Sequence, residues 1–256
     1  MSSFNPPEIR YQYLNSLGIT SEELHEQHRL ASALIDSLDK GTLTSIRNAF
    51  LDSTRTSNAG ELFINIDKIN ILLRTGNSGA EHSMIRNGYG RLVSPTRSHT
   101  INGDRCISGF DFKALIEARI HISSRRNQRQ NLYLRYVHQL VEYLIYHPTL
   151  RDYHNLYADE VERYRPQLKK SRIEHYKITQ CEFTGEYIDN NAKVEFAHID
   201  SVVTNPHKAI SIDNGVIILK NIHSDMTRKH IHTFEDMLDY CIENNYSILW
   251  ADNYVR

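Results

Sequence analysis

The sequence is poor in cysteine, proline and tryptophan, and it has no long apolar run. Its three cysteines, Cys106, Cys181 and Cys241, are widely spaced and odd in number. This spacing argues against a disulfide framework, and the lack of a Cys-x-x-Cys pair excludes a four-cysteine zinc site. The apolar runs are far shorter than the ~20 residues that span a bilayer. We therefore expect a protein of the reducing cytoplasm with no membrane partner.

A large net charge of either sign is also lacking. The formal net charge is −1 for 256 residues, of which 40% are hydrophobic and 24% charged. These values are ordinary for a globular protein of one or two domains, and they argue against wholesale disorder. Any nucleic-acid surface must therefore be a local basic patch. The N-terminus has neither the basic nor the apolar region of a secretion signal.

The first part of the chain is predicted to be mainly helical. Thr20 has the capping-box spacing to Glu23, and apolar residues follow at helical intervals, which predicts a helix from Thr20 to about Leu38. A second helix is predicted over residues 43–51. Residues 62–73 are rich in isoleucine, and their pattern does not separate helix from strand.

Two longer stretches follow. Residues 74–109 are rich in glycine and polar side chains, which predicts a long connection between elements. Residues 110–146 carry an apolar stripe at helical spacing, and Pro148 is expected to end that helix.

The basic residues cluster in two places. Between Ala118 and Val141 there is no acidic residue, and Tyr133 and Tyr136 stand among the arginines, a mixture that suits phosphate contact with stacking on a base. A second basic run precedes the last third of the chain, and Pro166 within it indicates a boundary or linker. A solvated charged face is the alternative interpretation of both. The residues predicted to contact nucleic acid are Arg125, Arg126, Arg129, Lys169 and Lys170.

The last third of the chain predicts the order strand, long loop, strand, helix, helix. Residues 193–199 are predicted to form a short strand, with Val194, Phe196 and Ala197 available for packing. Residues 215–219 are a β-branched and aliphatic run, and the dipeptide Asn214-Gly215 favours a turn before it. A helix is predicted to follow directly. The last helix is predicted over residues 234–243, with Thr233 as its cap.

Two histidines and one asparagine occupy positions in this order that suit phosphodiester chemistry. His198 ends the first strand, Asn214 precedes the second, and His223 lies on the helix that follows. A neutral imidazole can take a proton from water near physiological pH. A second imidazole can hold a divalent cation against a phosphate.

Residues 181–240, roughly a quarter of the chain, resemble the HNH endonuclease family with its ββα-metal fold. The resemblance rests on the Cys-x-x-Thr-Gly sequence from Cys181 to Gly185, on Ala197-His198-Ile199, on the apolar run that follows Asn214, and on His223. It is closest to the subgroup whose first motif reads Ala-His-Ile.

The resemblance implies a role for each motif residue. It makes His198 the general base, Asn214 the residue that steadies the loop and orients that histidine, and His223 the ligand of the catalytic metal. Asp200 is a second candidate ligand, directly or through water. The expected cation is Mg²⁺, with Mn²⁺ and Ni²⁺ as alternatives, because mixed nitrogen and oxygen ligation selects weakly among them.

The chain also departs from the family pattern. Ala197 stands where many members have an acidic or histidine ligand, and Thr227 stands where some have a further one. Asp225 and His230 are weaker candidates for that task. The metal would therefore have only one well-identified protein ligand, His223.

These observations lead to one preferred hypothesis and two alternatives. We expect an α+β protein with a mainly helical region over residues 1–170, which selects the target or mediates oligomerisation such as a homodimer, and an HNH nuclease core over residues 171–256. The expected activity is metal-dependent endonucleolytic cleavage of DNA, of a restriction, defence or phage type. A non-catalytic nucleic-acid-binding protein with a degenerate HNH fold is one alternative, motivated by Ala197. A nuclease toxin with an immunity-protein partner is the other.

Overall fold

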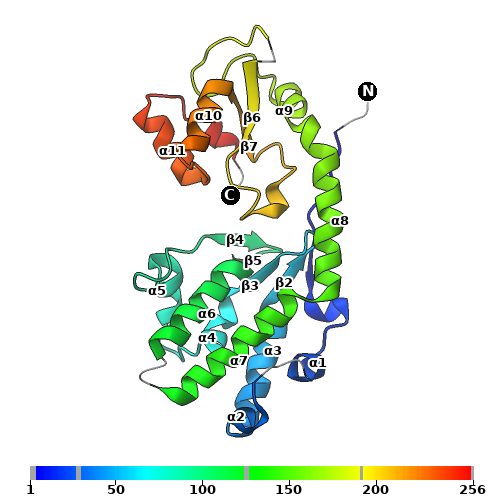
Figure 1. Ribbon diagram of the computed structural model, residues 1–256, viewed down its shortest axis with the longest axis vertical. Coiled ribbons are helices and arrows are strands. Elements are labelled where there is room, and N and C mark those ends of the chain that lie inside the picture. The colour runs from blue at the N-terminus through cyan, green and yellow to red at the C-terminus, as the bar shows by residue number, and fades with distance from the viewer. Residues whose placement is uncertain (1–3, 27–29, 124–126, 191–192, 255–256) are drawn as a thin grey trace. The chain divides into compact units, whose positions relative to one another are not determined.

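The chain is a mixed α and β protein that divides into two compact units (Figure 1). The structure, a computed structural model, describes residues 4–26, 30–123, 127–190 and 193–254. The N-terminal unit is Ile9–Asn155, and the C-terminal unit is Leu156–Arg256 together with Met1–Glu8. The division falls within helix α8 (Pro148–Tyr164), earlier in the chain than the boundary expected at residue 170.

The N-terminal unit contains a five-stranded antiparallel sheet, so the prediction of a mainly helical region was incomplete. The strand order is β1-β2-β3-β5-β4. The strands are β1 (Tyr11–Tyr13), β2 (Thr54–Ser57), β3 (Leu62–Asn65), β4 (Ser98–Ile101) and β5 (Asp104–Ser108). Each strand is only three to five residues long, which is too short for an alternating pattern to stand out in the sequence.

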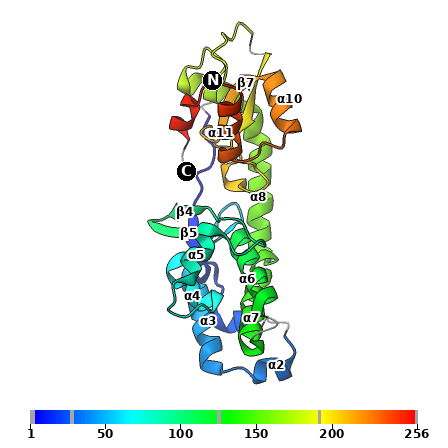
Figure 2. The same cartoon turned by 90° about the vertical axis from the view of Figure 1, so that its left-hand side faces the viewer.

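The central strand β3 is buried on both faces. Leu62 and Ile64 join the main apolar cluster of the unit, whereas Phe63 packs on the other face with Cys106. Helices α6 (Gly109–Ser123) and α7 (Gln128–Ile145) lie side by side and supply much of that main cluster (Figure 2).

The remaining helices of this unit are short, with one exception. They are α1 (Ser21–Glu26), α2 (Ser32–Asp36), α3 (Lys40–Ser53), α4 (Ile69–Leu73) and α5 (Ala80–Asn87). The helix predicted over residues 43–51 is confirmed within α3. The cap at Thr20 is confirmed, because its Oγ1 accepts a hydrogen bond from the Glu23 amide at 3.2 Å. The single helix predicted from Thr20 to Leu38 was wrong, since α1 and α2 are separate.

Residues 74–109 are more ordered than the predicted long connection. They contain α5 and the hairpin of β4 and β5. Asn102 and Gly103 connect the two strands with φ of 52° and 86°, the left-handed values that a two-residue type I′ turn requires. Residues 62–73 prove to be strand followed by helix, with β3 leading through a 3-10 turn (Ile66–Lys68) into α4.

Both prolines singled out in the sequence lie at helical starts. Pro148 is the first residue of α8, a position where its missing amide hydrogen costs no hydrogen bond, and α7 already ends at Ile145. Pro166 lies in a 3-10 turn (Arg165–Gln167) that leads from α8 into α9 (Leu168–Tyr176). The basic run is therefore helical and not an extended linker.

The C-terminal unit has the element order that the sequence predicted. Strand β6 (Val194–His198) pairs antiparallel with β7 (Gly215–Leu219), which runs into α10 (Lys220–Arg228) and then α11 (Phe234–Glu243). A 3-10 turn (Leu249–Asn253) follows. The predicted cap of α11 is confirmed, because the Asp236 amide donates to Thr233 Oγ1 at 3.1 Å.

Helices cover the two-stranded sheet of β6 and β7. Both α10 and α9 contact the two strands (Figure 1). Ala197, Val216 and Ile218 point into an apolar cluster with Met237 and Trp250. None of the helices in the described part of the chain is long and apolar enough to cross a membrane.

Candidate active site

The pairing of β6 and β7 fixes where His198 lies. His198 is opposite Gly215, and Phe196 is opposite Ile217. A Cβ on Gly215 would lie 2.0 Å from the Phe196 ring, so the ring occupies the space that glycine leaves. The same ring meets the His198 imidazole edge-on, with centroids 5.0 Å apart. Gly215 is therefore needed as a packing site within the strand and not as the turn residue that its sequence context favoured.

The environment of His198 defines which ring nitrogen can act as a base. His198 Nε2 lies 3.0 Å from the carbonyl oxygen of Ala209. Since a carbonyl oxygen only accepts hydrogen bonds, Nε2 carries the hydrogen, and Nδ1 of the neutral ring holds the lone pair. Burial lowers the pKa of His198 below its ordinary value, and the charges of Arg165 and His223 act in the same direction. The ring is therefore neutral at physiological pH.

His223 is hydrogen-bonded through the other ring nitrogen, Nδ1. It lies on α10, and its Nδ1 is 2.7 Å from Glu195 Oε2 on β6. The carboxylate accepts the Nδ1 hydrogen, which leaves the Nε2 lone pair for a metal ion or a proton. A carboxylate bound to the far nitrogen of a histidine is a common support for a metal-ligating imidazole. Glu195 was not identified from the sequence, although alternation along β6 places it on the same face as Ala197, toward α10.

Both histidines line one pocket, which we call the imidazole pocket. Its volume is about 320 Å³. The basic side chains at its surface are Arg165, Lys169, His198, His223 and His232. The other lining residues are Leu168, Phe196, Ala197, Ser201, Val202, Met226, Thr227 and Ile231. Of the described residues that line it, none is acidic, so the pocket suits an anion such as a phosphate group.

Asn214 ties together the loop that connects β6 to β7. Its side chain is buried, its Oδ1 accepts from the Asp200 amide at 2.9 Å, and its Nδ2 donates to the carbonyl oxygens of Asp200 and Lys208 at 3.1 and 3.2 Å. These hydrogen bonds tie residues 200, 208 and 214 of the loop to one another. Its side chain is not among the residues that line the imidazole pocket.

Asp200, the second predicted metal ligand, has a different environment. Its side chain is buried and accepts from the Phe234 amide at 3.2 Å and from Lys208 Nζ at 3.0 Å, with a further hydrogen bond from the Tyr254 hydroxyl. With both carboxylate oxygens engaged and no position in the pocket lining, Asp200 lacks the geometry of a direct ligand. The weaker candidate Asp225 likewise binds Lys229 and Tyr240.

The residues predicted to contact nucleic acid are distributed unevenly. Lys169 lines the imidazole pocket, and its Nζ donates to the Val194 carbonyl at 2.7 Å. Lys170 is exposed on α9 beside Glu174, at 3.8 Å. Arg129 is exposed at the start of α7. Arg125 and Arg126 lie outside the described residues.

One of the two interpretations of this basic segment had its tyrosines stack on bases, and their burial excludes that. Tyr133 and Tyr136 are 5% and 0% exposed and belong to the apolar cluster of the N-terminal unit. Each hydroxyl has an internal partner, the Asp39 amide for Tyr133 and Arg47 for Tyr136. The aromatic stripe in this basic segment is therefore structural.

The described residues supply one group that suits a metal ion, the His223 imidazole. His223 offers Nε2, with its far nitrogen held by Glu195 as a ligand requires. Within the described ranges, no three His, Cys, Asp or Glu side chains gather closely enough to coordinate a common ion. A cation at His223 would therefore take most of its ligands from water and from a bound phosphate.

Protein-family models, curated proteins and solved structures were each compared with this chain, and none of them matches it. The resemblance to the HNH family therefore rests on the motif residues that carry it.

Proposed function

We propose that the C-terminal unit is a metal-dependent endonuclease that hydrolyses phosphodiester bonds of DNA in the imidazole pocket. The observation that carries the proposal is the opposite anchoring of two imidazoles in one basic pocket. His198 is held through Nε2, which leaves Nδ1 as a base, and His223 is held through Nδ1, which leaves Nε2 as a ligand. A base and an electrophile beside the same phosphate are the parts that hydrolysis needs.

Four residues of the pocket would take part in the reaction. His198 Nδ1 would accept a proton from the attacking water, and its lowered pKa keeps it ready to do so at neutral pH. Arg165 and Lys169 would hold the phosphate by charge. His223 would hold a divalent cation such as Mg²⁺, which supplies Lewis-acid stabilisation of the phosphate and of the leaving oxygen when bound.

The topology supports the family assignment behind this proposal. A base at the end of the first strand, an asparagine that closes the connecting loop, and a ligand on the helix after the second strand follow the ββα-metal order. Ala197 is buried in the core and offers no ligand. The site would therefore rely on the substrate to complete the coordination of the metal.

The proposal is tested by cleavage of supercoiled and 5′-end-labelled DNA with Mg²⁺, Mn²⁺ or EDTA. We expect metal-dependent cleavage by the wild type and a loss on the order of 10²- to 10⁴-fold for His198→Ala, the usual contribution of a general base. His82→Ala is the matched control, since His82 is exposed in the N-terminal unit. A folded protein that binds DNA with or without metal and never cuts it would instead be the non-catalytic binding module.

The metal ligand is tested separately by Mn²⁺ titration of Glu195→Gln in the presence of a short DNA duplex. Removing the carboxylate that anchors His223 should weaken metal binding by roughly 10- to 100-fold. Unchanged Mn²⁺ affinity would show that the Glu195 carboxylate does not support a metal ligand at His223.

A further inference from the structure

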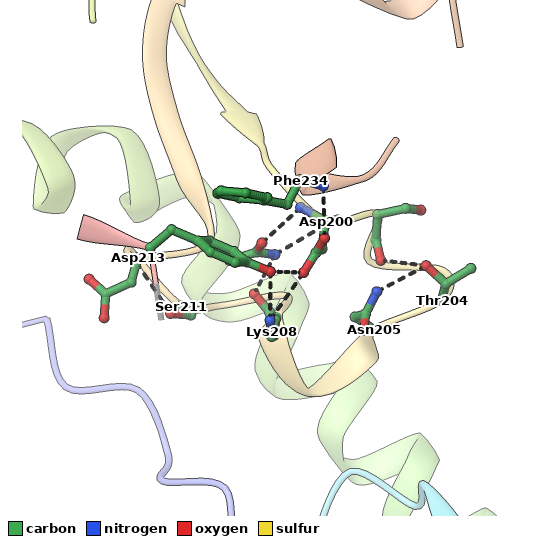
Figure 3. A network of polar contacts seen from close by, with 10 residues as sticks. Asp200, Thr204, Asn205, Lys208, Ser211, Asp213 and Phe234 are labelled. Atoms are coloured by element: carbon green, nitrogen blue, oxygen red, sulfur yellow. Dashed lines mark hydrogen bonds and ion pairs between the residues drawn. The ribbon is translucent and has the colours of Figure 1, made fainter. Parts of the chain in front are cut away.

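A buried polar cluster joins Asp200 and Lys208, in the loop between β6 and β7, to the start of α11 at Phe234 (Figure 3). Asp200 is 1% exposed, and its carboxylate faces the Lys208 ammonium at 3.0 Å and the Phe234 amide at 3.2 Å. The Lys208 ammonium also donates to the Tyr254 hydroxyl at 2.9 Å, and that hydroxyl bonds Asp200 as well. Asp200, Lys208 and Tyr254 thus close a ring of charge-assisted contacts, and the Phe234 amide adds a further hydrogen bond to Asp200.

The burial of this cluster fixes its geometry. A buried carboxylate is costly unless it is paired and hydrogen-bonded, and removing one partner leaves the other uncompensated. The side chains of Asp200 and Lys208 are 1% and 13% exposed, so neither can turn to water without breaking the pair. The Lys208 carbonyl is bound in addition by Asn214 Nδ2 at 3.2 Å. Both ends of Lys208, side chain and carbonyl, are therefore held.

The residue after Lys208 is the one that orients His198. Ala209 offers the carbonyl oxygen that accepts from His198 Nε2 at 3.0 Å, and its own amide donates to the Pro206 carbonyl at 2.9 Å. The peptide between Lys208 and Ala209 is thus held at both its carbonyl and its amide, which restricts the direction of the Ala209 carbonyl. That direction decides which nitrogen of His198 carries the hydrogen.

Tyr254 brings a distant part of the chain into this cluster. It follows the 3-10 turn at Leu249–Asn253, and its ring stacks on the Phe234 ring with centroids 4.7 Å apart. The Lys208 ammonium also lies over the Tyr254 ring, 4.7 Å from its centroid. The tyrosine thus has two separable parts, a ring that packs and a hydroxyl that binds the ion pair.

We propose that Tyr254, Asp200 and Lys208 form a positioning clamp for His198. The clamp holds the Ala209 carbonyl, selects the tautomer of His198 with hydrogen on Nε2, and keeps Nδ1 as the lone-pair nitrogen. The tautomer selection is a property of the fold. Its consequence for catalysis depends on the nuclease function proposed above.

The test is the tautomeric state of His198 in Tyr254→Phe, read from the ¹⁵N chemical shifts of histidine-labelled protein and assigned with His198→Ala. The wild type should show a protonated Nε2 and an unprotonated Nδ1. Tyr254→Phe keeps the ring that stacks on Phe234 and loses the hydroxyl, so the two shifts should move toward each other as both tautomers become populated. We expect kcat for DNA cleavage to fall by roughly 10- to 100-fold, the range typical of outer-shell partners, with little change in KM.

Tyr246→Phe is the matched control, because Tyr246 packs on Phe183 in the same unit and outside the clamp. It should leave both readouts unchanged. Trp250 fluorescence verifies folding in each variant, since Trp250 is the sole tryptophan and is buried in the core of this unit. If Tyr254→Phe fails to fold, Lys208→Gln is the alternative variant, because it breaks the ion pair and keeps a hydrogen-bond donor. It should likewise populate both tautomers of His198.

The outcomes separate the clamp from the nuclease function. A folded Tyr254→Phe protein with the wild-type tautomer overturns the clamp. Mixed tautomers with wild-type cleavage support the clamp and overturn the assignment of His198 as the base. Mixed tautomers in a protein whose wild type does not cleave DNA support the clamp and overturn the proposed function.

Discussion

The two units differ in the interactions that stabilise them, apolar packing in one and apolar packing with buried ion pairs in the other. The N-terminal unit has the larger apolar cluster, built from a sheet and the helices packed on it. The C-terminal unit has a smaller apolar cluster and two ion pairs that are buried on both sides, Arg172–Glu182 and Lys208–Asp200, whereas the Arg55–Asp104 pair of the N-terminal unit leaves the carboxylate partly exposed. Apolar packing is non-directional and fixes whole elements, whereas a buried ion pair fixes particular atoms. The unit that carries the imidazole pocket uses the second means for its loops.

The largest expected effect tests that difference in the C-terminal unit. Glu182 accepts from Arg172 Nε and Nη2 at 3.0 and 2.7 Å and from the Ile217 amide at 2.6 Å. Glu182→Ala leaves Arg172, which is fully buried, without its carboxylate. We expect the free energy of unfolding of this unit to fall by about 3–5 kcal/mol. Denaturant titration followed by Trp250 fluorescence measures it.

The matching change in the N-terminal unit is Leu140→Ala. Leu140 is 1% exposed in the main apolar cluster, so truncation should destabilise that unit by about 2–5 kcal/mol. Far-UV circular dichroism should then show an earlier helical transition, while the Trp250 transition stays at its wild-type midpoint. A Trp250 transition that moves by the same amount would mean that the two units unfold as one, and the contrast between them would fail.

A smaller loss of stability is expected from Gly215→Ala, because Gly215 packs against the Phe196 ring that lines the imidazole pocket. The Cβ of Gly215→Ala would displace the Phe196 ring and, with it, the edge contact to His198. We expect a loss of about 1–3 kcal/mol in stability, as for overpacked cores, together with slower DNA cleavage. Gly41→Ala is the control, because Gly41 lies within α3 and an added methyl there meets only Asp39 at 3.4 Å. That substitution should be neutral or slightly stabilising, and equal losses for both would contradict the packing argument.

The smallest effect on stability is expected from lowering the pH, through protonation of His198. Burial lowers the pKa of His198, so the folded state resists its protonation and the unfolded state does not. The contribution to stability is complete above the ordinary histidine value of about 6.5 and decreases as pH falls below it. The acidic limb of the cleavage rate should accordingly lie below pH 6.5. A pH–rate profile that reaches half-maximum above pH 6.5 would contradict this environment for His198.

The sequence predicts the C-terminal unit better than the N-terminal unit, for identifiable reasons. Strand β7 is a run of β-branched and aliphatic side chains after Gly215, and Thr233 caps α11 through a local hydrogen bond, so local pattern and fold agree there. In the N-terminal sheet, the strands are short and pair across long separations. The turn at Asn102-Gly103 was the one strong local signal for its β4–β5 hairpin, and it was included in a predicted connection.

The candidate site could be predicted in part. His198, Asn214 and His223 lie on the predicted elements because their spacing reflects the order of strand, loop, strand and helix. Glu195 and the clamp at Tyr254 depend on tertiary contacts that no local spacing encodes. Tyr133 and Tyr136 were expected at a surface and are buried, since an arginine-rich helix still needs an apolar face to pack.

The two-stranded sheet of β6 and β7 has two outer edges, and a side chain occupies part of each. Lys169 Nζ donates to the outward Val194 carbonyl of β6. On β7, the Glu182 carboxylate accepts from the Ile217 amide, and the Glu182 backbone amide donates to the Ile217 carbonyl. An unpaired strand edge can form hydrogen bonds with a strand of another chain and so promote aggregation, and a lysine at the edge commonly prevents this. Neutralising Lys169 should therefore make the protein prone to aggregate through β6.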